Sequence, residues 1–152
     1  MRVAVGCDCY GYPLKLAVLR WLADNGHEVI DVGCPSIEPD EKLCDYADAV
    51  CKAVLGGEVE RGVLMCMTGG VMSMRANRHE GIRAGLCHGG QQAKMLRQLS
   101  DMNVLVMAGQ TTSPFLAEHL LKDFMETEFE ALERRVRRLE RLDAAVGEHG
   151  HV

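Results

Sequence analysis

The sequence is dominated by an alternation of short apolar runs with longer amphipathic segments. The apolar runs have the length and composition of buried strands, and they lie at residues 2–6, 27–32, 62–65, 82–87 and 104–107. Segments with helical spacing, roughly 10 to 15 residues long, separate these runs. Strands that alternate with helices in this way form right-handed βαβ units, so the pattern predicts a parallel sheet with helices on both faces.

Proline and glycine residues indicate where the helices begin and end. Pro13 lies near the start of the first predicted helix, Gly26 follows its end, and Gly56 and Gly57 end the second. We predict helices over residues 13–25, 43–55, 71–78, 91–99 and 114–125, and a charge-rich helical segment over 126–146 whose last few residues fray. Neither a linker nor a repeat divides the sequence. We therefore predict a single domain over residues 1–152, of which about 127–152 form a helical C-terminal extension.

The composition fits a globular chain and argues against several classes of function. Hydrophobic residues make up 47% of the 152 residues and charged residues 26%, which suffices for a full core. The 17 basic and 22 acidic residues give a net charge of −5, and only 5% of residues are aromatic, which does not suit nucleic-acid binding. No apolar run has the length of a membrane span, and Asp8 interrupts any signal-like start. We expect a cytoplasmic protein without nucleic-acid or membrane partners.

Seven cysteines in a chain expected to be cytoplasmic require an explanation. Their number is odd and no C-x-x-C pair occurs, so a zinc ribbon is poorly supported and we expect no metal. In a reducing compartment most cysteines are small buried apolar residues, and we expect one or two of these to carry chemistry. A redox pair of Cys7 and Cys9 is an alternative. The seven are Cys7, Cys9, Cys34, Cys44, Cys51, Cys66 and Cys87.

The predicted topology brings two reactive segments together. Parallel sheets bind ligands beyond the carboxyl ends of their strands, at the point where the strand order reverses. For the order 2-1-3-4-5 this point lies between the first and third strands, which lead into residues 6–9 (GCDC) and 66–70 (CMTGG). These segments are the richest in glycine and reactive side chains, so they predict a binding or catalytic site.

Cys66 is the strongest candidate for chemistry in this predicted site. It is expected at a strand end before a glycine pair and a helix start, where backbone N–H groups favour the thiolate over the thiol. A thiolate can act there as a nucleophile or a base, and the N–H groups of residues 68–71 can hold a developing oxyanion. Asp8 can orient a substrate hydroxyl. The alternative, that Cys66 is a core cysteine and that Gly69 and Gly70 form only a turn, stays open.

Motifs of other common enzyme classes are absent from the sequence. It lacks the G-x-G-x-x-G dinucleotide pattern, the G-x-x-x-x-G-K-[ST] nucleotide pattern and the G-x-S-x-G nucleophile elbow, so we expect no cofactor. His88 follows a predicted strand, where a solvated loop histidine is the more ordinary interpretation. The arginine-rich residues 133–138 are mixed with acidic ones and predict a solvated helix face. Those arginines could also reach a phosphate, in the same chain or across a dimer.

One long segment resembles a known family of sugar-phosphate isomerases. Residues 66–78, CMTGGVMSMRANR, resemble the C-G-T-G-x-G-x-S-x-x-x-N-[KR] segment of type B ribose-5-phosphate isomerase and the galactose-6-phosphate isomerase subunits. The match includes the cysteine, the threonine, one glycine, the serine, the asparagine and the final basic residue. The opening VAVGCD and residues 27–33, HEVIDVG, resemble the first two strands of the family, so the resemblance covers nearly the whole chain.

The resemblance implies a Rossmann-like sandwich, a homodimer or higher homo-oligomer with sites at the subunit interface, and a sugar phosphate as ligand. It implies metal-independent aldose–ketose isomerisation, in which a base moves a proton between adjacent carbons through a cis-enediolate. Cys66 would be the base, Thr68 would assist near the ring or carbonyl oxygen, and Asp8 and Asn77 would position the substrate or the loop. The other substrate-binding residues would be Cys9, Gly69, Gly70, Val71, Ser73, Ser100, Arg134 and Arg138.

Several positions depart from the family pattern. Cys9 replaces a histidine, and Met67 and Val71 replace two of the loop glycines. If those positions need a positive φ, a side chain reshapes the anion pocket, and Gly70 could supply flexibility one position earlier. Leu99 replaces the histidine credited with opening the sugar ring. The further replacements are Leu43 and Cys44 for a tyrosine–proline pair, Ser100 for an asparagine and Gln110 for a phosphate-binding arginine.

Three interpretations of this pattern remain open. The first is an isomerase for a substrate that needs no ring opening, such as a four-carbon sugar phosphate, which cannot close a furanose ring. The second is a subunit of a hetero-oligomer completed by a homologous chain, because Leu99 also resembles the B subunit of galactose-6-phosphate isomerase. The third is a sugar-phosphate-binding protein that kept the fold and lost catalysis.

Overall fold

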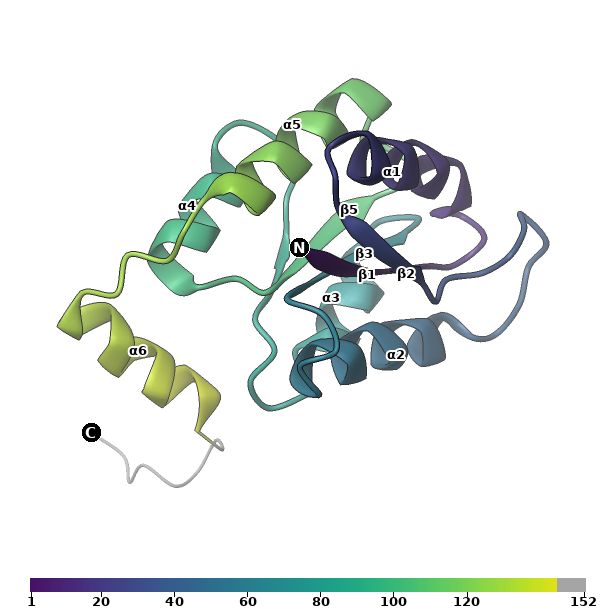
Figure 1. The fold of residues 1–152 in the computed structure, drawn as a ribbon. Helices are drawn as coiled ribbons and strands as arrows, with labels where there is room; N and C mark the ends of the chain where they lie inside the picture. The colour runs from purple at the N-terminus through teal and green to yellow at the C-terminus, as the bar shows by residue number, and fades with distance from the viewer. Residues whose placement is uncertain (145–152) are drawn as a thin grey trace.

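Five parallel strands form one sheet through the middle of the molecule (Figure 1). The computed structural model describes residues 1–144. The strands are β1 (Arg2–Cys7), β2 (Glu28–Asp31), β3 (Arg61–Cys66), β4 (Ala84–Leu86) and β5 (Val104–Ala108). Each predicted strand is present, and β4 is the one most shortened, because only three of the residues predicted over 82–87 pair with a neighbour.

The order of the strands along the sheet differs from the predicted one. It is β2-β1-β3-β5-β4, so that β5 lies inside and β4 forms an edge, whereas the expected order was 2-1-3-4-5. Burial agrees with this order, because all five residues of β5 are buried while the three residues of β4 are only partly buried. An interior parallel strand suits a continuous apolar run such as VLVMA, and a short strand suits an edge.

Helices cover both faces of the sheet, which confirms the predicted three-layer α/β/α sandwich. α1, α4 and α5 lie on one face, and α2 and α3 lie on the other (Figure 1). The helices are α1 (Tyr12–Asp24), α2 (Leu43–Leu55), α3 (Gly70–Ala76), α4 (Gln92–Ser100), α5 (Pro114–Glu126) and α6 (Glu133–Asp143). Among residues 1–144, no helix is both long enough and apolar enough to cross a membrane.

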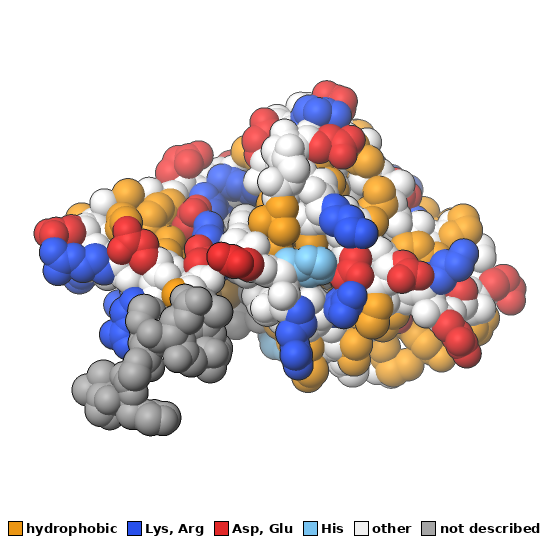
Figure 2. Space-filling view, turned by 90° about the horizontal axis from the view of Figure 1, so that it is seen from below, with side chains coloured by type: hydrophobic (Ala, Val, Ile, Leu, Met, Phe, Trp, Pro, Cys, Tyr) orange, Lys and Arg blue, Asp and Glu red, His pale blue; other side chains and the backbone are white. Residues whose placement is uncertain are grey.

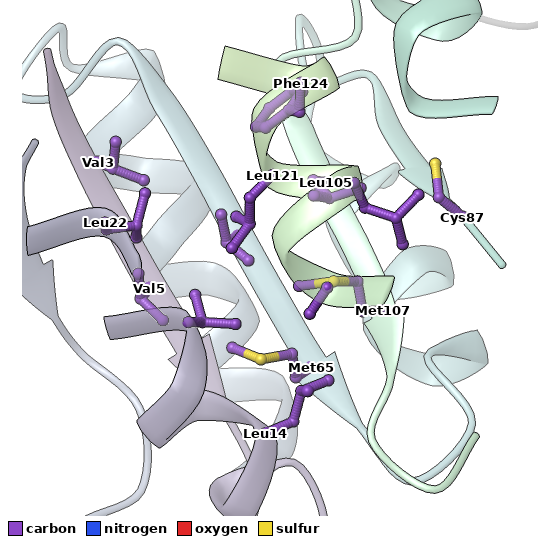
Figure 3. Packing of buried hydrophobic residues seen from close by; sticks show 14 of the residues in the cluster. Val3, Val5, Leu14, Leu22, Met65, Cys87, Leu105, Met107, Leu121 and Phe124 are labelled. Carbon is purple, nitrogen blue, oxygen red and sulfur yellow. The ribbon is translucent and has the colours of Figure 1, made fainter. Parts of the chain in front are cut away.

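Successive residues of the strands point into two separate cores. On the side of α1, α4 and α5, Val5 of β1 and Leu105 of β5 pack with Leu22 of α1 and Phe124 of α5 (Figure 3). The core on the other side includes Ala4, Val50, Leu64, Met72 and Val106. Burying each large apolar side chain contributes about 1.5–3 kcal/mol. Both helical layers therefore hold the strand ends in fixed positions.

A cluster of charged side chains joins α2 to α3 on the second face. Asp48 of α2 accepts hydrogen bonds from Arg75 Nε at 2.7 Å and Arg75 Nη2 at 2.6 Å, and His79 Nε2 lies 2.8 Å from the same carboxylate. The Arg75 side chain lowers the pKa of Asp48 to about 2. Figure 2 shows lysine and arginine side chains interspersed with acidic ones over this face. The cluster holds α3, which follows β3, against α2.

The helix predicted over residues 126–146 begins later than expected. α5 ends at Glu126 and α6 begins at Glu133, so the prediction of helix over residues 127–132 is wrong. Arg61 of β3 donates to the carbonyl oxygens of Phe124 and Thr127, and Arg97 Nε donates to the Thr127 carbonyl at 3.3 Å. Because these carbonyls are bound by arginines, the chain turns away from the helix axis. Residues 145–152, where fraying was expected, lie outside the described residues.

Helix α6 extends from the body of the molecule beside α4 (Figure 1). The preceding segment is attached to α4, because Glu130 N donates to Gln98 O at 3.0 Å. The far end of α6 is attached to the sheet, because Arg83 Nη1 lies 2.9 Å from Asp143 Oδ2. α6 therefore has a defined position although most of its surface is exposed.

Candidate active site

The two reactive segments meet at the carboxyl ends of β1 and β3. These strands are neighbours in the sheet, with Cys7 of β1 beside Met65 of β3, and β5 pairs with the other side of β3. Asp8 N continues the pairing by donating to Met65 O at 3.3 Å. The exchange of β4 and β5 leaves β1 and β3 adjacent, so the predicted site keeps its place in the corrected sheet.

Asp8 closes the turn that leaves β1. Its Oδ1 accepts a hydrogen bond from Gly11 N at 2.9 Å, and only 6% of the residue is exposed. Burial raises the pKa of the Asp8 carboxyl, and the backbone N–H groups of Gly11 and Tyr10 oppose that rise. Gly11 allows the turn to lie against β3, because a Cβ there would come within 2.6 Å of Met65 O. The side chain of Asp8 is therefore held rigidly beside the end of β3.

Cys66 is the last residue of β3 and is nearly covered. It is 3% exposed and belongs to the core under α2 and α3, together with Met72 and Val106. Its carbonyl accepts a hydrogen bond from Gly109 N at 2.7 Å. A Cβ at position 109 would lie 2.6 Å from Tyr10 O and 3.3 Å from Cys66 O, so three strand ends approach closely around this cysteine.

The loop after Cys66 turns directly into α3. Gly69 has φ +75 and is the N-cap residue of α3, and Ser73 N donates to Gly69 O at 3.0 Å. A Cβ at position 69 would lie 2.4 Å from Leu86 Cδ1, so both the backbone conformation and the space require glycine there. Thr68 Oγ1 accepts from Gly70 N at 3.3 Å. The first N–H groups of a helix lack partners within the helix and can receive a ligand anion.

The residues at the two replaced glycine positions have ordinary backbone conformations. Among the non-glycine residues that the structure describes, only Asp101 has a positive φ, so Met67 and Val71 are unstrained. Gly70 has no positive φ either, so the backbone conformation at this position does not require glycine. Their exposed fractions are 36% for Met67 and 50% for Val71. The effect of these side chains is therefore added apolar bulk at the surface of the loop.

Asn77 holds the end of α3 to the edge strand. Its Nδ2 donates to Ser73 O at 3.0 Å and to Ala84 O at 2.9 Å, and its Oδ1 accepts from Ala84 N at 2.9 Å. Both atoms of the amide are therefore engaged with the backbone. This geometry favours the loop-positioning role for Asn77 over direct contact with a substrate.

Three other predicted ligand-binding residues lie near the amino ends of the strands, opposite the carboxyl ends where Cys66 lies. Ser100 ends α4, which leads into the amino end of β5, and it lines a hollow beside Leu142 of α6. Arg134 and Arg138 line a second hollow on α6, together with Arg137 and Arg141. In a parallel sheet the amino ends are separated from the carboxyl ends by the length of the strands. One chain therefore does not bring Ser100, Arg134 and Arg138 to Cys66.

The structure separates Arg135 from the other arginines of α6. The side chain of Arg135 donates to Gln98 O and to Glu130, so it serves to attach α6 to α4. Arg134 and Arg138, one helical turn apart, line the hollow together with Arg137 and Arg141. This arrangement is compatible with the predicted pair of anion-binding arginines.

The structure does not bring Cys7 and Cys9 together as the redox alternative required. Cys9 is buried directly after Asp8, but the sulfur beside Cys7 Sγ is that of Cys34, at 3.5 Å, and not that of Cys9. Burial raises the pKa of Cys7 far above its usual value, which disfavours a reactive thiolate. Among residues 1–144, no group of three or more His, Cys, Asp or Glu side chains is arranged to hold a metal ion.

Gly11 and Gly109 are site residues that the sequence interpretation missed. Each follows a strand end and permits a backbone approach that a Cβ would block. The available signal was a glycine just beyond a buried strand, as in the segments CDCYGYP and VLVMAGQ. Their partners come from distant strands, so that signal could not say what approaches them.

The fold and the site define a Rossmann-like α/β protein with a cysteine and a glycine-dependent loop at the point where its strand order reverses. The family model described as Ribose/Galactose Isomerase matches residues 3–142. The chain belongs to this family, which is a family of sugar-phosphate isomerases, as the segment 66–78 indicated.

Individual relatives agree with this membership. The chain is 37% identical over 129 residues to ribose-5-phosphate isomerase B of Escherichia coli, covering 85% of this chain and 86% of that protein. It is 33% identical over 129 residues to 4-deoxy-4-sulfo-D-erythrose isomerase of a Clostridium species, covering 85% and 81%. The crystal structure of a ribose 5-phosphate isomerase from Thermotoga maritima has a TM-score of 0.90 and 35% identity, covering 93% and 97%.

Proposed function

We propose that the protein interconverts the aldose and ketose forms of a short sugar phosphate, with Cys66 as the base. The observation that carries this proposal is the position of Cys66, at the end of the central strand β3 and directly before the loop that begins α3. A buried thiol beside the N–H groups of residues 69–71 can exchange a proton with carbon while those groups hold the developing negative charge.

The reaction is a proton transfer that needs no oxidant. The Cys66 thiolate removes the proton from C2 of the aldose, the C–H electron pair becomes the second C1–C2 bond, and the carbonyl pair moves to O1. A proton then passes from O2 to O1. The O2 lone pair becomes the C2 carbonyl bond, and the second C1–C2 bond pair takes the proton of the Cys66 thiol to form the new C1–H bond. The product is the ketose, and the thiolate is regenerated. Because no step changes the overall oxidation state or uses a metal, the proposal predicts that the reaction is metal-independent.

The neighbouring residues have separate roles. The N–H groups of Gly69, Gly70 and Val71 stabilise the enediolate oxygen, and Thr68 supports the carbonyl oxygen. Asp8 orients a substrate hydroxyl, and its rigid turn supports that role. Ser73 is proposed as a substrate-binding residue because it lies in the first turn of α3, next to these N–H groups.

A substrate that needs no ring opening is favoured. Leu99 cannot donate or accept a proton, so the chain lacks the group that the family resemblance assigns to ring opening. A tetrose with an anionic group on its terminal carbon cannot form a furanose ring. One relative carries the name of a four-carbon sugar isomerase, which supports the same choice. The proposed substrate is therefore an open-chain sugar phosphate of about four carbons.

The complete site requires a second subunit. Within one chain, Cys66 lies at the carboxyl ends of the strands. The predicted anion-binding residues Ser100, Arg134 and Arg138 lie near the amino ends. A homodimer that places α6 of one subunit over the loop of the other would complete two equivalent sites. Leu99 favours a second candidate, in which a homologous chain supplies the missing group and forms a hetero-oligomer.

Solvent-deuterium incorporation measured by NMR tests the proposal. Purified protein is incubated in deuterium oxide with four-, five- and six-carbon sugar phosphates, beside the Cys66→Ala variant. The matched control is Cys51→Ala, which removes an equally buried thiol from α2 in the same core. We expect deuterium at the carbon next to the carbonyl with the wild type and Cys51→Ala, and none with Cys66→Ala.

Other outcomes separate the alternatives. Exchange that persists in a folded Cys66→Ala variant would remove Cys66 from the mechanism. If pure protein gives no exchange but co-expression with a homologous chain restores it, the hetero-oligomer is correct. A sugar phosphate that stabilises the protein without exchange, by about 2.7 kcal/mol at 100 times its dissociation constant, would indicate a binding protein.

A further inference from the structure

Two exposed apolar side chains flank the loop that the mechanism uses. Met67 directly follows Cys66 and is 36% exposed, and Val71 lies in the first turn of α3 and is 50% exposed. Between them lie residues 68–70, and the N–H groups of Gly69, Gly70 and Val71 are proposed to hold the enediolate. Large exposed apolar side chains beside a functional site contribute to recognition or to an interface, because leaving them in water is unfavourable.

The backbone at both positions is fixed. Gln110 N donates to Met67 O at 3.1 Å, so the end of β3 stays paired with the segment after β5. Val71 follows the N-cap residue Gly69, whose carbonyl accepts from Ser73 N. Neither residue has a positive φ, so neither side chain strains the loop. The two side chains therefore add exposed apolar surface on both sides of a loop whose backbone is held by hydrogen bonds.

We infer that Met67 and Val71 determine the length of the substrate. This inference rests on the proposed isomerase function and deepens it. A fifth carbon brings a further hydroxyl group. Against the Met67 thioether and the two Val71 methyl groups, that hydroxyl would lose its hydrogen bonds to water and gain at most a weak one to sulfur. A four-carbon chain carries one hydroxylated carbon fewer and avoids this loss. Smaller residues at positions 67 and 71 would admit water or hydroxyl groups to the same space.

The double variant Met67→Ala, Val71→Ala tests the inference, because alanine removes the bulk and keeps the backbone preference. The control is Leu55→Ala, which shortens a similarly exposed side chain at the end of α2, at the opposite edge of the sheet. The ratio of kcat/KM for a five-carbon to a four-carbon open-chain sugar phosphate is measured by deuterium exchange. We expect this ratio to rise about tenfold or more in the double variant and to stay unchanged in Leu55→Ala.

A binding measurement keeps the test independent of turnover. Erythritol 4-phosphate and ribitol 5-phosphate are unreactive open-chain probes of four and five carbons. We expect the four-carbon probe to raise the melting temperature of the wild type more, and the five-carbon probe to gain in the double variant.

The outcomes distinguish failure of the inference about Met67 and Val71 from failure of the proposed isomerase function. Exchange with an unchanged chain-length ratio in the folded double variant overturns the role of Met67 and Val71 and leaves the isomerase standing. A changed subunit number with the same ratio shows that the two side chains serve an interface, which also overturns the inference. If neither protein exchanges any sugar phosphate or responds to either probe, the isomerase proposal fails, and the inference fails with it.

Discussion

Gly69 is the position in the loop after β3 where a side chain is least tolerable. Its φ of +75 costs an L residue about 1–2 kcal/mol, and a Cβ would lie 2.4 Å from Leu86 Cδ1. We expect Gly69→Ala to lower the free energy of unfolding by about 2 kcal/mol, measured by urea unfolding. Gly70→Ala is the control, because Gly70 has a negative φ and its nearest Cβ contact is 3.4 Å. Equal losses in both variants would contradict this assignment.

Asp8 should make stability depend on pH in a specific direction. Burial raises the pKa of its carboxyl, so the folded state favours the protonated form. The stabilising contribution is present below the unfolded pKa and is lost as pH rises through the folded pKa. Asp8→Asn keeps an oxygen for the Gly11 N–H and carries no charge. We expect its free energy of unfolding, relative to wild type, to increase between about pH 3 and pH 7. Chemical unfolding at several pH values measures this difference, and a constant difference would count against the buried carboxylate.

At the scale of elements, α3 depends on its attachment to α2. Arg75 lowers the pKa of Asp48 to about 2, so the ion pair stabilises the fold above about pH 4 and is lost as pH falls toward 2. Since Arg75 is partly exposed, we expect Asp48→Asn to cost about 1 kcal/mol at pH 7 and almost nothing near pH 2. Urea unfolding at both pH values measures this, with Asp45→Asn as an exposed control on the same helix. A loss that is the same at both pH values would show that packing, and not charge, holds the two helices.

The elements also show what local sequence pattern can and cannot predict. The strands and most helices follow from apolar runs and from proline and glycine positions, because these signals are local. The strand order does not, because β4 and β5 differ in burial only after both have joined the sheet. The end of α5 likewise depends on Arg61 and Arg97, which come from 30 or more residues away.

Like the fold, the candidate site was predictable from the sequence where it depends on local signals, and not where it depends on contacts between distant segments. Asp8, Cys66 and the Gly69 turn lie at strand ends, where topology alone directs attention. The engagement of Asn77 with Ala84 and the close approach of Gly109 to Tyr10 are contacts between segments distant in sequence. No periodicity encodes such contacts, so only the three-dimensional structure reveals them.

At the scale of the whole molecule, the division of the proposed site between two edges allows a complementation test. The Cys66→Ala protein and the double variant Arg134→Ala, Arg138→Ala are each expected to be inactive. In a re-equilibrated equal mixture half of the dimers are mixed, and each mixed dimer has one complete site, so we expect about a quarter of wild-type activity. Deuterium exchange measures the recovery. No recovery from a mixture shown to contain mixed dimers would place both sets of residues in one subunit or exclude the arginines.

The unstrained backbone at Met67 and Val71 has a consequence for how such a protein can change over generations. Of the three glycine positions in the motif that this loop resembles, only Gly69 combines a left-handed conformation with a blocked Cβ. The other two positions can carry a side chain while Cys66 and the start of α3 stay in place. In the proposed isomerase, substitutions at these two positions would change which sugar phosphate is accepted and would leave Cys66 and Gly69 unchanged. A new substrate preference would then need only a few substitutions, none of which removes the turn at Gly69.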